Sequence, residues 1–199
     1  CPDRQRPNPR GRLIEASLFA VNAPVRWHQA EASVAASAYV GVARHYAIRL
    51  NVATYPHTGL AKEAYYAFQG VGGETAYSGR TTDVGIGAMM FPRKLWSGIS
   101  FELGALRRVI DVREQFDYQK SEARKGAGIV GRALVGWSWL FGDRVFVATG
   151  VGMSIGRYAL REDTIYMDPG YPAMDEGRNV VVFEPSFEGY FRIGIAATL

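Results

Sequence analysis

The sequence has almost no cysteine: Cys1 is the single one among 199 residues. An internal disulfide and a metal site built from cysteines are therefore excluded. The chain also lacks any run approaching the roughly 18–20 consecutive apolar residues that a membrane-spanning helix needs, and its mean hydropathy is only −0.08. These two features exclude a helical membrane protein. They do not exclude a β-barrel, because barrels alternate apolar and polar residues.

An excess of one charge sign is equally lacking. Lys and Arg number 23 against 19 Asp and Glu, which gives a formal net charge of +4. The basic residues are scattered and form no stripe with interleaved aromatics, which argues against nucleic-acid binding. Apolar residues make up 48% of the chain and charged residues 21%, so disorder is not expected, and the length suits one domain.

What the sequence does have is regular alternation, which is clearest on both sides of Gly142-Asp143. One face of residues 125–161 is continuously apolar, and the other is mostly Gly, Ala and Ser with an occasional charge. Two such segments around a tight reversal are typical of a hairpin in a transmembrane β-barrel.

The same alternation predicts six further strands, which gives eight in all. Short reversals are expected near residues 44, 93 and 142, whereas the connections near 23, 56–81, 113–125 and 162–179 are mostly longer. The six further strands are expected at 12–22, 29–43, 46–55, 82–91, 97–112 and 180–198.

In this pattern of strands and connections, residues 12–199 resemble the small eight-stranded bacterial outer-membrane β-barrel proteins of the OmpA/OmpX type. The resemblance implies an all-β, eight-stranded antiparallel up-and-down transmembrane β-barrel in the Gram-negative outer membrane. It also implies periplasmic N- and C-termini and long extracellular loops. Such barrels often end in an aromatic residue, and this chain departs from that by ending Ala197-Thr198-Leu199. Residues 1–11, rich in Pro and Arg, are expected to be a periplasmic tether.

The alternative fold is a soluble lipocalin-like ligand-binding barrel, apolar inside and polar outside. Its water-facing positions would be rich in charged residues, whereas Gly, Ala and Ser suit a narrow lumen better. Aromatic residues also favour the membrane barrel: Trp96, Trp139 and Phe141 flank short turns, where an interfacial girdle would place them, and Trp27 lies near the opposite rim.

Charged residues on the small-residue face form the first candidate site. They would lie inside the lumen, where charges persist only when they are paired. A gated pore or proton relay is one interpretation, and a structural ion-pair network that closes the lumen is the interpretation we adopt. The predicted luminal network comprises Glu15, Arg49, Glu102, Arg132, Glu188 and Arg192.

A second candidate site lies on the lipid-facing side. Arg107 and Arg157 fall near the upper ends of their strands, and Lys125 begins the strand between them. The three would form a row at headgroup height that contacts the phosphates of lipopolysaccharide. Ordinary solvated charge just above the bilayer is the alternative.

Residues for catalysis are few, and we expect no catalytic site, cofactor or metal, so the protein is predicted not to be an enzyme. His57 with Ser78 in the same long loop could form part of a hydrolase site, but an exposed loop histidine is the preferred interpretation. His28 and His45 also lie at strand ends or in loops. A weak calcium site is weighed against a solvated loop for Asp163, Asp168, Asp175 and Glu176.

Cys1, followed by the tether, resembles the N-terminus that signal cleavage leaves in bacterial lipoproteins, and we expect it to carry a lipid. A truncated, tagged or renumbered chain is the alternative, and the intact mass of the native protein tests it. The predicted function is a structural or surface-interaction protein of the outer membrane whose partners are lipid and lipopolysaccharide. A membrane-anchoring subunit of a larger envelope assembly is the alternative. The apolar loop segment 64–68 is expected to pack over the mouth of the barrel, and a binding surface for such an envelope protein is the alternative for it.

Overall fold

Strands make up the fold in the computed structural model, which describes residues 12–24, 31–57, 75–116, 120–142, 144–166 and 174–197. Cys1, the tether and Trp27 lie outside the described residues. The described elements, all strands, are β1 (Arg12–Pro24), β2 (Glu31–Ala43), β3 (Tyr46–Pro56), β4 (Thr75–Met90), β5 (Gly98–Phe116), β6 (Lys120–Phe141), β7 (Val145–Tyr166) and β8 (Met174–Ala197). None of the described residues forms a helix long and apolar enough to cross a membrane.

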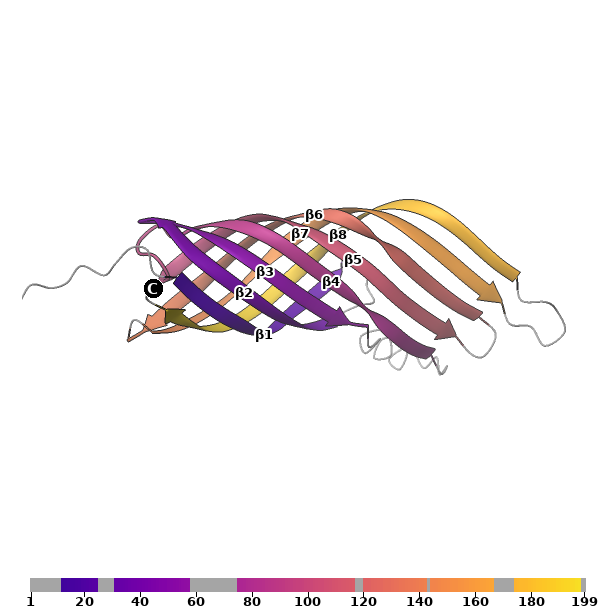
Figure 1. Cartoon of the computed structure of the whole chain (residues 1–199), viewed down its shortest axis with the longest axis horizontal. Helices are drawn as coiled ribbons and strands as arrows, with labels where there is room; N and C mark the ends of the chain where they lie inside the picture. The colour runs from indigo at the N-terminus through magenta and orange to yellow at the C-terminus, as the bar shows by residue number, and fades with distance from the viewer. Residues whose placement is uncertain are drawn as a thin grey trace, which may run out of the picture.

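The strands pair in chain order, and each neighbouring pair is antiparallel. β1 also pairs with β8, from Arg12 opposite Ala197 to Pro24 opposite Ser186, so that the sheet closes on itself around an interior (Figure 1). The predicted all-β, antiparallel, up-and-down arrangement is confirmed.

Three predicted loops are shorter than expected. β5 continues to Phe116 and β6 begins at Lys120, so most of the predicted loop 113–125 is strand. The predicted loop 162–179 shrinks because β7 reaches Tyr166 and β8 begins at Met174, and β4 begins at Thr75, inside the predicted break 56–81. Consequently β5 to β8 reach furthest at one end of the sheet (Figure 1).

From the sequence alone, charged residues at these strand ends indicate loops, but most of them lie in strands. Charged side chains there pair across strands, as Glu162 does with Arg124 (3.2 Å) and with Arg178 (2.8 Å), while the backbone ladder continues beneath them. Opposite charges that face one another across two strands stabilise a sheet. A charged segment is therefore compatible with a strand when its partner strand carries the complementary charges.

The short connections lie where the sequence predicts them. Arg44 and His45 form the turn between β2 and β3. Gly142 follows β6 with a φ of +56°, a left-handed conformation that glycine adopts without steric cost, which explains why glycine comes first in this turn. The β4–β5 connection covers residues 91–97, slightly more than the 92–96 left between the predicted strands, and an isolated bridge joins Lys94 to Ser97 within it.

Side chains alternate between the interior and the outer face. On β3 the alternation is perfect from Tyr46 to Pro56. The interior positions hold polar, charged and aromatic side chains and also an aliphatic cluster that includes Leu106, Val130 and Leu160. Large apolar side chains are exposed on the outer face of every strand from β2 to β8. The outer face differs from that of a soluble domain, on which large contiguous apolar surfaces are rare.

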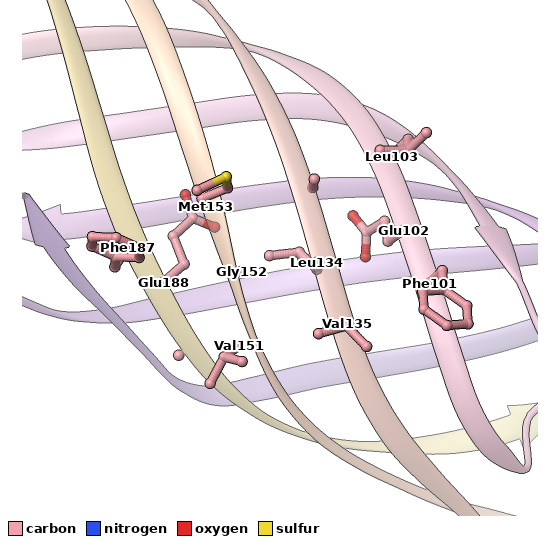
Figure 2. A pocket seen from close by; sticks show the side chains of 12 residues that line it. Phe101, Glu102, Leu103, Leu134, Val135, Val151, Gly152, Met153, Phe187 and Glu188 are labelled. Carbon is pink, nitrogen blue, oxygen red and sulfur yellow. The ribbon is translucent and has the colours of Figure 1, made fainter.

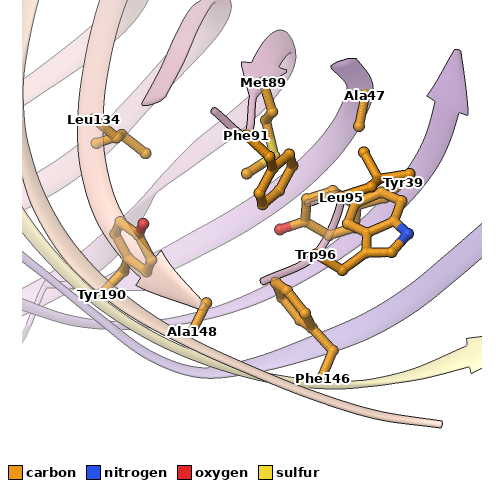
Figure 3. Close-up of a cluster of buried hydrophobic side chains, with 10 residues drawn as sticks. All are labelled: Tyr39, Ala47, Met89, Phe91, Leu95, Trp96, Leu134, Phe146, Ala148 and Tyr190. Atoms are coloured by element: carbon orange, nitrogen blue, oxygen red, sulfur yellow. The ribbon is translucent and has the colours of Figure 1, made fainter. Parts of the chain in front are cut away.

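At the end of the sheet that carries the short connections, four aromatic side chains fill the interior (Figure 3). We call Tyr39, Phe91, Trp96 and Phe146 the aromatic plug; the ring centroid of Trp96 lies 5.8 Å from that of Tyr39, 5.5 Å from Phe91 and 6.2 Å from Phe146. The prediction that Trp96 lies in an interfacial girdle is wrong. The β4–β5 connection directs it inward, with a positive φ of 65°, and leaves it 6% exposed. Trp139 and Phe141 are exposed on the outer face.

Candidate functional site

Seven charged side chains meet inside the sheet, and each is less than a tenth exposed. Strand alternation explains their position, because each occupies an inward-facing place on its strand. They come from β3 (Arg49), β4 (Asp83), β5 (Glu102, Arg108), β6 (Arg132) and β8 (Glu188, Arg192).

Glu102 is the centre of the first half of this network. Arg49 Nη1 donates to both of its carboxylate oxygens at 2.9 Å. Arg132 Nη2 donates to Oε1 at 3.0 Å and Arg192 Nη1 to Oε2 at 3.3 Å. One carboxylate is thus shared by three guanidinium groups that reach it from three other strands.

Room for Glu102 comes from a glycine on the neighbouring strand. A Cβ atom added at Gly87 on β4 would lie 2.9 Å from Glu102 Oε1 and 3.2 Å from its Cγ. The small residues on the inward face therefore have a packing role, since they leave space for long side chains in a narrow interior.

Asp83 and Arg108 form the second half. Arg108 Nε donates to Asp83 Oδ1 and Nη2 to Oδ2, both at 2.7 Å. This two-pronged geometry matches the planar guanidinium to the planar carboxylate. Arg108 Nη1 also donates to the Tyr158 hydroxyl at 3.2 Å.

Glu188 links the two halves. Its Oε1 lies 3.8 Å from Arg108 Nη2, and its Oε2 lies 3.8 Å from Arg132 Nη1. Both separations are ion pairs without a hydrogen bond, so Glu188 holds the halves together by charge more than by directed contacts. The result is one continuous charged layer across the interior.

Neutral groups complete the layer. Arg49 Nε donates to Ser37 Oγ at 3.0 Å, and Arg132 Nη2 to Asn51 Oδ1 at 3.0 Å. The guanidinium of Arg192 stacks 3.8 Å from the centroid of the Tyr190 ring, and its Nη1 donates to the Tyr39 hydroxyl at 3.2 Å. Through Tyr39 the charged layer joins the aromatic plug.

The structure brings together five of the six predicted luminal residues: Arg49, Glu102, Arg132, Glu188 and Arg192. The side chain of the sixth, Glu15, lies outside the described residues. Its backbone pairs with Ser37 on β2 and Gly194 on β8, and both of these positions are buried.

Sequence reasoning missed Asp83 and Arg108, although the signal was present. Asp83 alternates with the outward Val84, and Arg108 lies two residues beyond the inward Leu106. Continuing the alternation along both strands would have placed the two on the inner face with opposite charges.

On the outer face the predicted row of three cations is only partly formed. Arg107 and Arg157 both pair with Ile129 of β6 in the backbone register and so share one cross-strand row. Lys125 lies four residues before Ile129 on β6 and is therefore in a different row. It pairs in register with Asp111, with which it forms the 3.6 Å ion pair.

The catalytic and metal candidates are placed as follows. His57 is buried, not exposed as predicted, with Nε2 3.4 Å from Glu114 Oε1, because β3 ends beside β4 and the His57 amide donates to Gly79 O. Ser78 is exposed, and strand alternation puts it on the opposite face from His57. His45 is half-buried, with Nδ1 2.9 Å from the Phe91 carbonyl oxygen, and His28 lies outside the described residues.

Within the described part of the chain, no three His, Cys, Asp or Glu side chains cluster as metal ligands would. Asp163 accepts a hydrogen bond from Arg161 at 2.7 Å. Asp168 and the side chains of Asp175 and Glu176 lie outside the described residues, so the calcium interpretation stays a prediction for them.

Comparison with known protein families finds no family model that matches the chain. A search of curated proteins likewise finds no similar sequence.

Proposed function

We propose that this protein is a non-enzymatic integral outer-membrane β-barrel whose lumen is closed, and that it serves as a structural or surface-interaction protein. The observation that carries the proposal is the exposure of the outer face. Leu50, Leu103, Val151 and Ile195 are between 54% and 69% exposed, on four different strands, while the charged layer is buried. Such an outer face suits hydrocarbon better than water.

The closed sheet supports the same proposal. In hydrocarbon every backbone polar group needs a partner within the protein, and a sheet whose first and last strands pair satisfies this requirement. Eight strands enclose an interior that side chains just fill. The charged layer and the aromatic plug occupy it in succession, which is why the proposed lumen is closed.

The proposed orientation rests on the two-residue turn at 44–45, at one end of the sheet, and on the longest connection, residues 57–74, at the other. The start of β1, the end of β8 and the connections at 44–45, 91–97 and 142–144 belong to one end of the sheet, and the connections that follow β1, β3, β5 and β7 belong to the other. Outer-membrane barrels have short periplasmic turns and longer extracellular loops. The termini are accordingly proposed to be periplasmic.

The soluble lipocalin-like alternative is disfavoured by the same side chains. A lipocalin-type barrel binds an apolar ligand in an apolar interior, whereas this interior carries ion pairs such as Arg108–Asp83 and Arg49–Glu102. An apolar ligand could occupy this space only by separating these ion pairs. Buried charges would then lack partners, which is strongly unfavourable.

Conductance in planar lipid bilayers tests the closed lumen. Protein that has inserted, as judged by a gel mobility that differs between boiled and unboiled samples, should give no stable unitary conductance. A persistent conductance of folded protein would show that the charged layer and the plug leave an open path. Such a result would make the protein a pore.

A membrane-anchoring subunit of an envelope assembly is the second proposal that the sequence raises. Purification in mild detergent followed by native mass analysis separates the two. A subunit should bring a partner in fixed stoichiometry, and a protein that acts alone should give the mass of the single chain with lipid.

A further inference from the structure

The outer face of β5 to β8 carries an apolar hollow of about 800 Å³ (Figure 2). Its walls come from two cross-strand rows of residues, because the backbone register pairs Phe101 with Val135 and Leu103 with Ala133, and continues both rows through β7 to β8. The large side chains of the walls are exposed and turned outward: Phe101, Leu103, Val135, Val151, Met153 and Phe187.

The hollow exists because small residues interrupt these walls. Ala133 lies between Leu103 and Met153 in the second row, and Gly189 ends the first row. A Cβ atom added at Gly189, or at Gly131 in the next row along, would meet no atom within 4 Å. The next row toward Arg107 pairs Ala105 with Gly131, so small residues continue the low surface beyond the hollow. We call the hollow together with this low surface the trough.

Two arginines stand at the end of this trough. Arg107 and Arg157 flank Ile129 in the fourth row, so their backbones are about 10 Å apart across β6. Both are exposed, and among the described residues neither has a carboxylate within ion-pairing distance. Arg157 instead lies 5.9 Å from the centroid of the Phe183 ring. Two unneutralised guanidinium groups next to an apolar surface suit a phosphate, which each can bind with two hydrogen bonds.

The spacing agrees with one membrane leaflet. Six residues separate Phe101 from Arg107 along β5, which corresponds to about 20 Å. A strand tilted by about 40° covers about 15 Å of depth over that length, which is about half of a 30 Å hydrocarbon core. An acyl chain that fills the trough would place its headgroup beside the arginines.

We propose that this hollow, with Arg107 and Arg157, is a binding site for the lipid A part of lipopolysaccharide. One acyl chain lies in the trough and one phosphate lies between the two guanidinium groups. The inference rests on the proposed function, which puts this end of the strands in the outer leaflet, where lipopolysaccharide is the phosphate-bearing lipid. Lys125 takes no part, because Asp111 already neutralises it.

Retention of lipid A tests the site. The full chain is inserted into nanodiscs of phosphatidylcholine that contain a small fraction of diphosphoryl lipid A, extracted into mild detergent and analysed by native mass spectrometry. Wild type should retain one lipid A molecule. The Arg107→Gln/Arg157→Gln variant should retain about tenfold less, since charge-assisted hydrogen bonds are lost. Gly131→Phe, which fills the trough, should reduce retention several-fold.

Matched controls make comparable substitutions at exposed positions away from the proposed site. Arg93→Gln/Arg144→Gln removes two exposed arginines at the end with the short connections, and Ala38→Phe adds an outward phenyl group on β2. Both should retain lipid A as wild type does. Equal retention by all variants would overturn the site.

Two further experiments change the lipid and use only the wild-type protein, so their results do not depend on whether a variant folds. Lipid A without phosphates should be retained as poorly as by the arginine variant. Phosphatidylglycerol should be retained poorly too; retention equal to that of lipid A would overturn the assignment to lipid A. If the proposed function is wrong, the result differs from failure of the lipid A site. The chain would then stay in solution without detergent, would not insert into nanodiscs and would migrate equally on a gel whether boiled or unboiled.

Discussion

At the scale of single residues, the interior charges depend on Glu102. Its carboxylate lies within 3.3 Å of guanidinium nitrogens from Arg49, Arg132 and Arg192. Arginine cannot lose its proton inside a protein. Removing this carboxylate therefore leaves three fixed positive charges in the interior with few remaining partners.

Glu102→Ala should lower the free energy of unfolding by about 3–5 kcal/mol, the cost of breaking a buried ion pair from one side. Urea unfolding of the protein inserted in lipid vesicles measures this. The control is Asp111→Ala, which removes an exposed carboxylate from its pair with Lys125 and should cost less than about 1 kcal/mol. Equal effects of the two substitutions would show that the charged layer is not stabilised as described.

Asp83 and Arg108 allow a second test, because each is the other's main partner. Asp83→Asn and Arg108→Met should each be strongly destabilising, while the double variant should be less destabilised than the sum of the two. A coupling energy of about 2 kcal/mol is expected from a double-mutant cycle on unfolding free energies. Additive effects would argue against a direct interaction.

At the scale of elements, the aromatic plug shows how a connection can fill an interior. Trp96 lies in the β4–β5 connection but packs against Tyr39 of β2 and Phe146 of β7. It thus ties together strands that are not neighbours in the sheet.

Trp96→Ala should cost about 3 kcal/mol of unfolding free energy, since it leaves a cavity among buried rings. Trp139→Ala is the matched control: the side chain is the same size, but it is 41% exposed on the outer face and should cost clearly less. Trp fluorescence and gel mobility after partial heating would report both. A larger loss of unfolding free energy for Trp139→Ala than for Trp96→Ala would contradict the stabilising role given to the aromatic plug.

How far the sequence predicts these elements depends on which signal is used. Alternation located eight strands, because a two-residue period is imposed by the pleat of every strand. It failed at the strand ends, where the cross-strand pair Arg178–Glu162 lies in a segment predicted to be a loop. Charge alone does not distinguish a solvated loop from two strands whose side chains pair across the ladder.

The candidate site was predictable to a similar degree. The alternation along each strand places Glu102 of β5 and Arg132 of β6 inside. It does not predict which cation reaches which carboxylate across the interior. Trp96 was misplaced because no period governs a connection, and its inward direction follows from a backbone conformation with positive φ. The lipid A trough spans rows of four strands, a register that only the paired structure supplies.

At the scale of the whole molecule, the fold has charges inside and apolar side chains outside. Large contiguous apolar surfaces are rare on soluble monomers, and this distribution therefore supports the proposal that the outer face lies in hydrocarbon. Membrane insertion is therefore the central claim, and the proposed closed lumen and lipid A site both depend on it.

The most direct measurement is the cost of an arginine on the outer face. Leu50 is 54% exposed, lies midway along β3 and is separated by β4 from the strands that form the lipid A trough. Leu50→Arg should lower the free energy of unfolding in vesicles by about 2–4 kcal/mol, the cost of a charge near the bilayer midplane, and Gln115→Arg at the far end of β5 by no more than about 1 kcal/mol. In a water-soluble barrel both exposed substitutions would stay within about 0.5 kcal/mol of wild type. A neutral Leu50→Arg in a protein that remains folded without detergent would contradict the account.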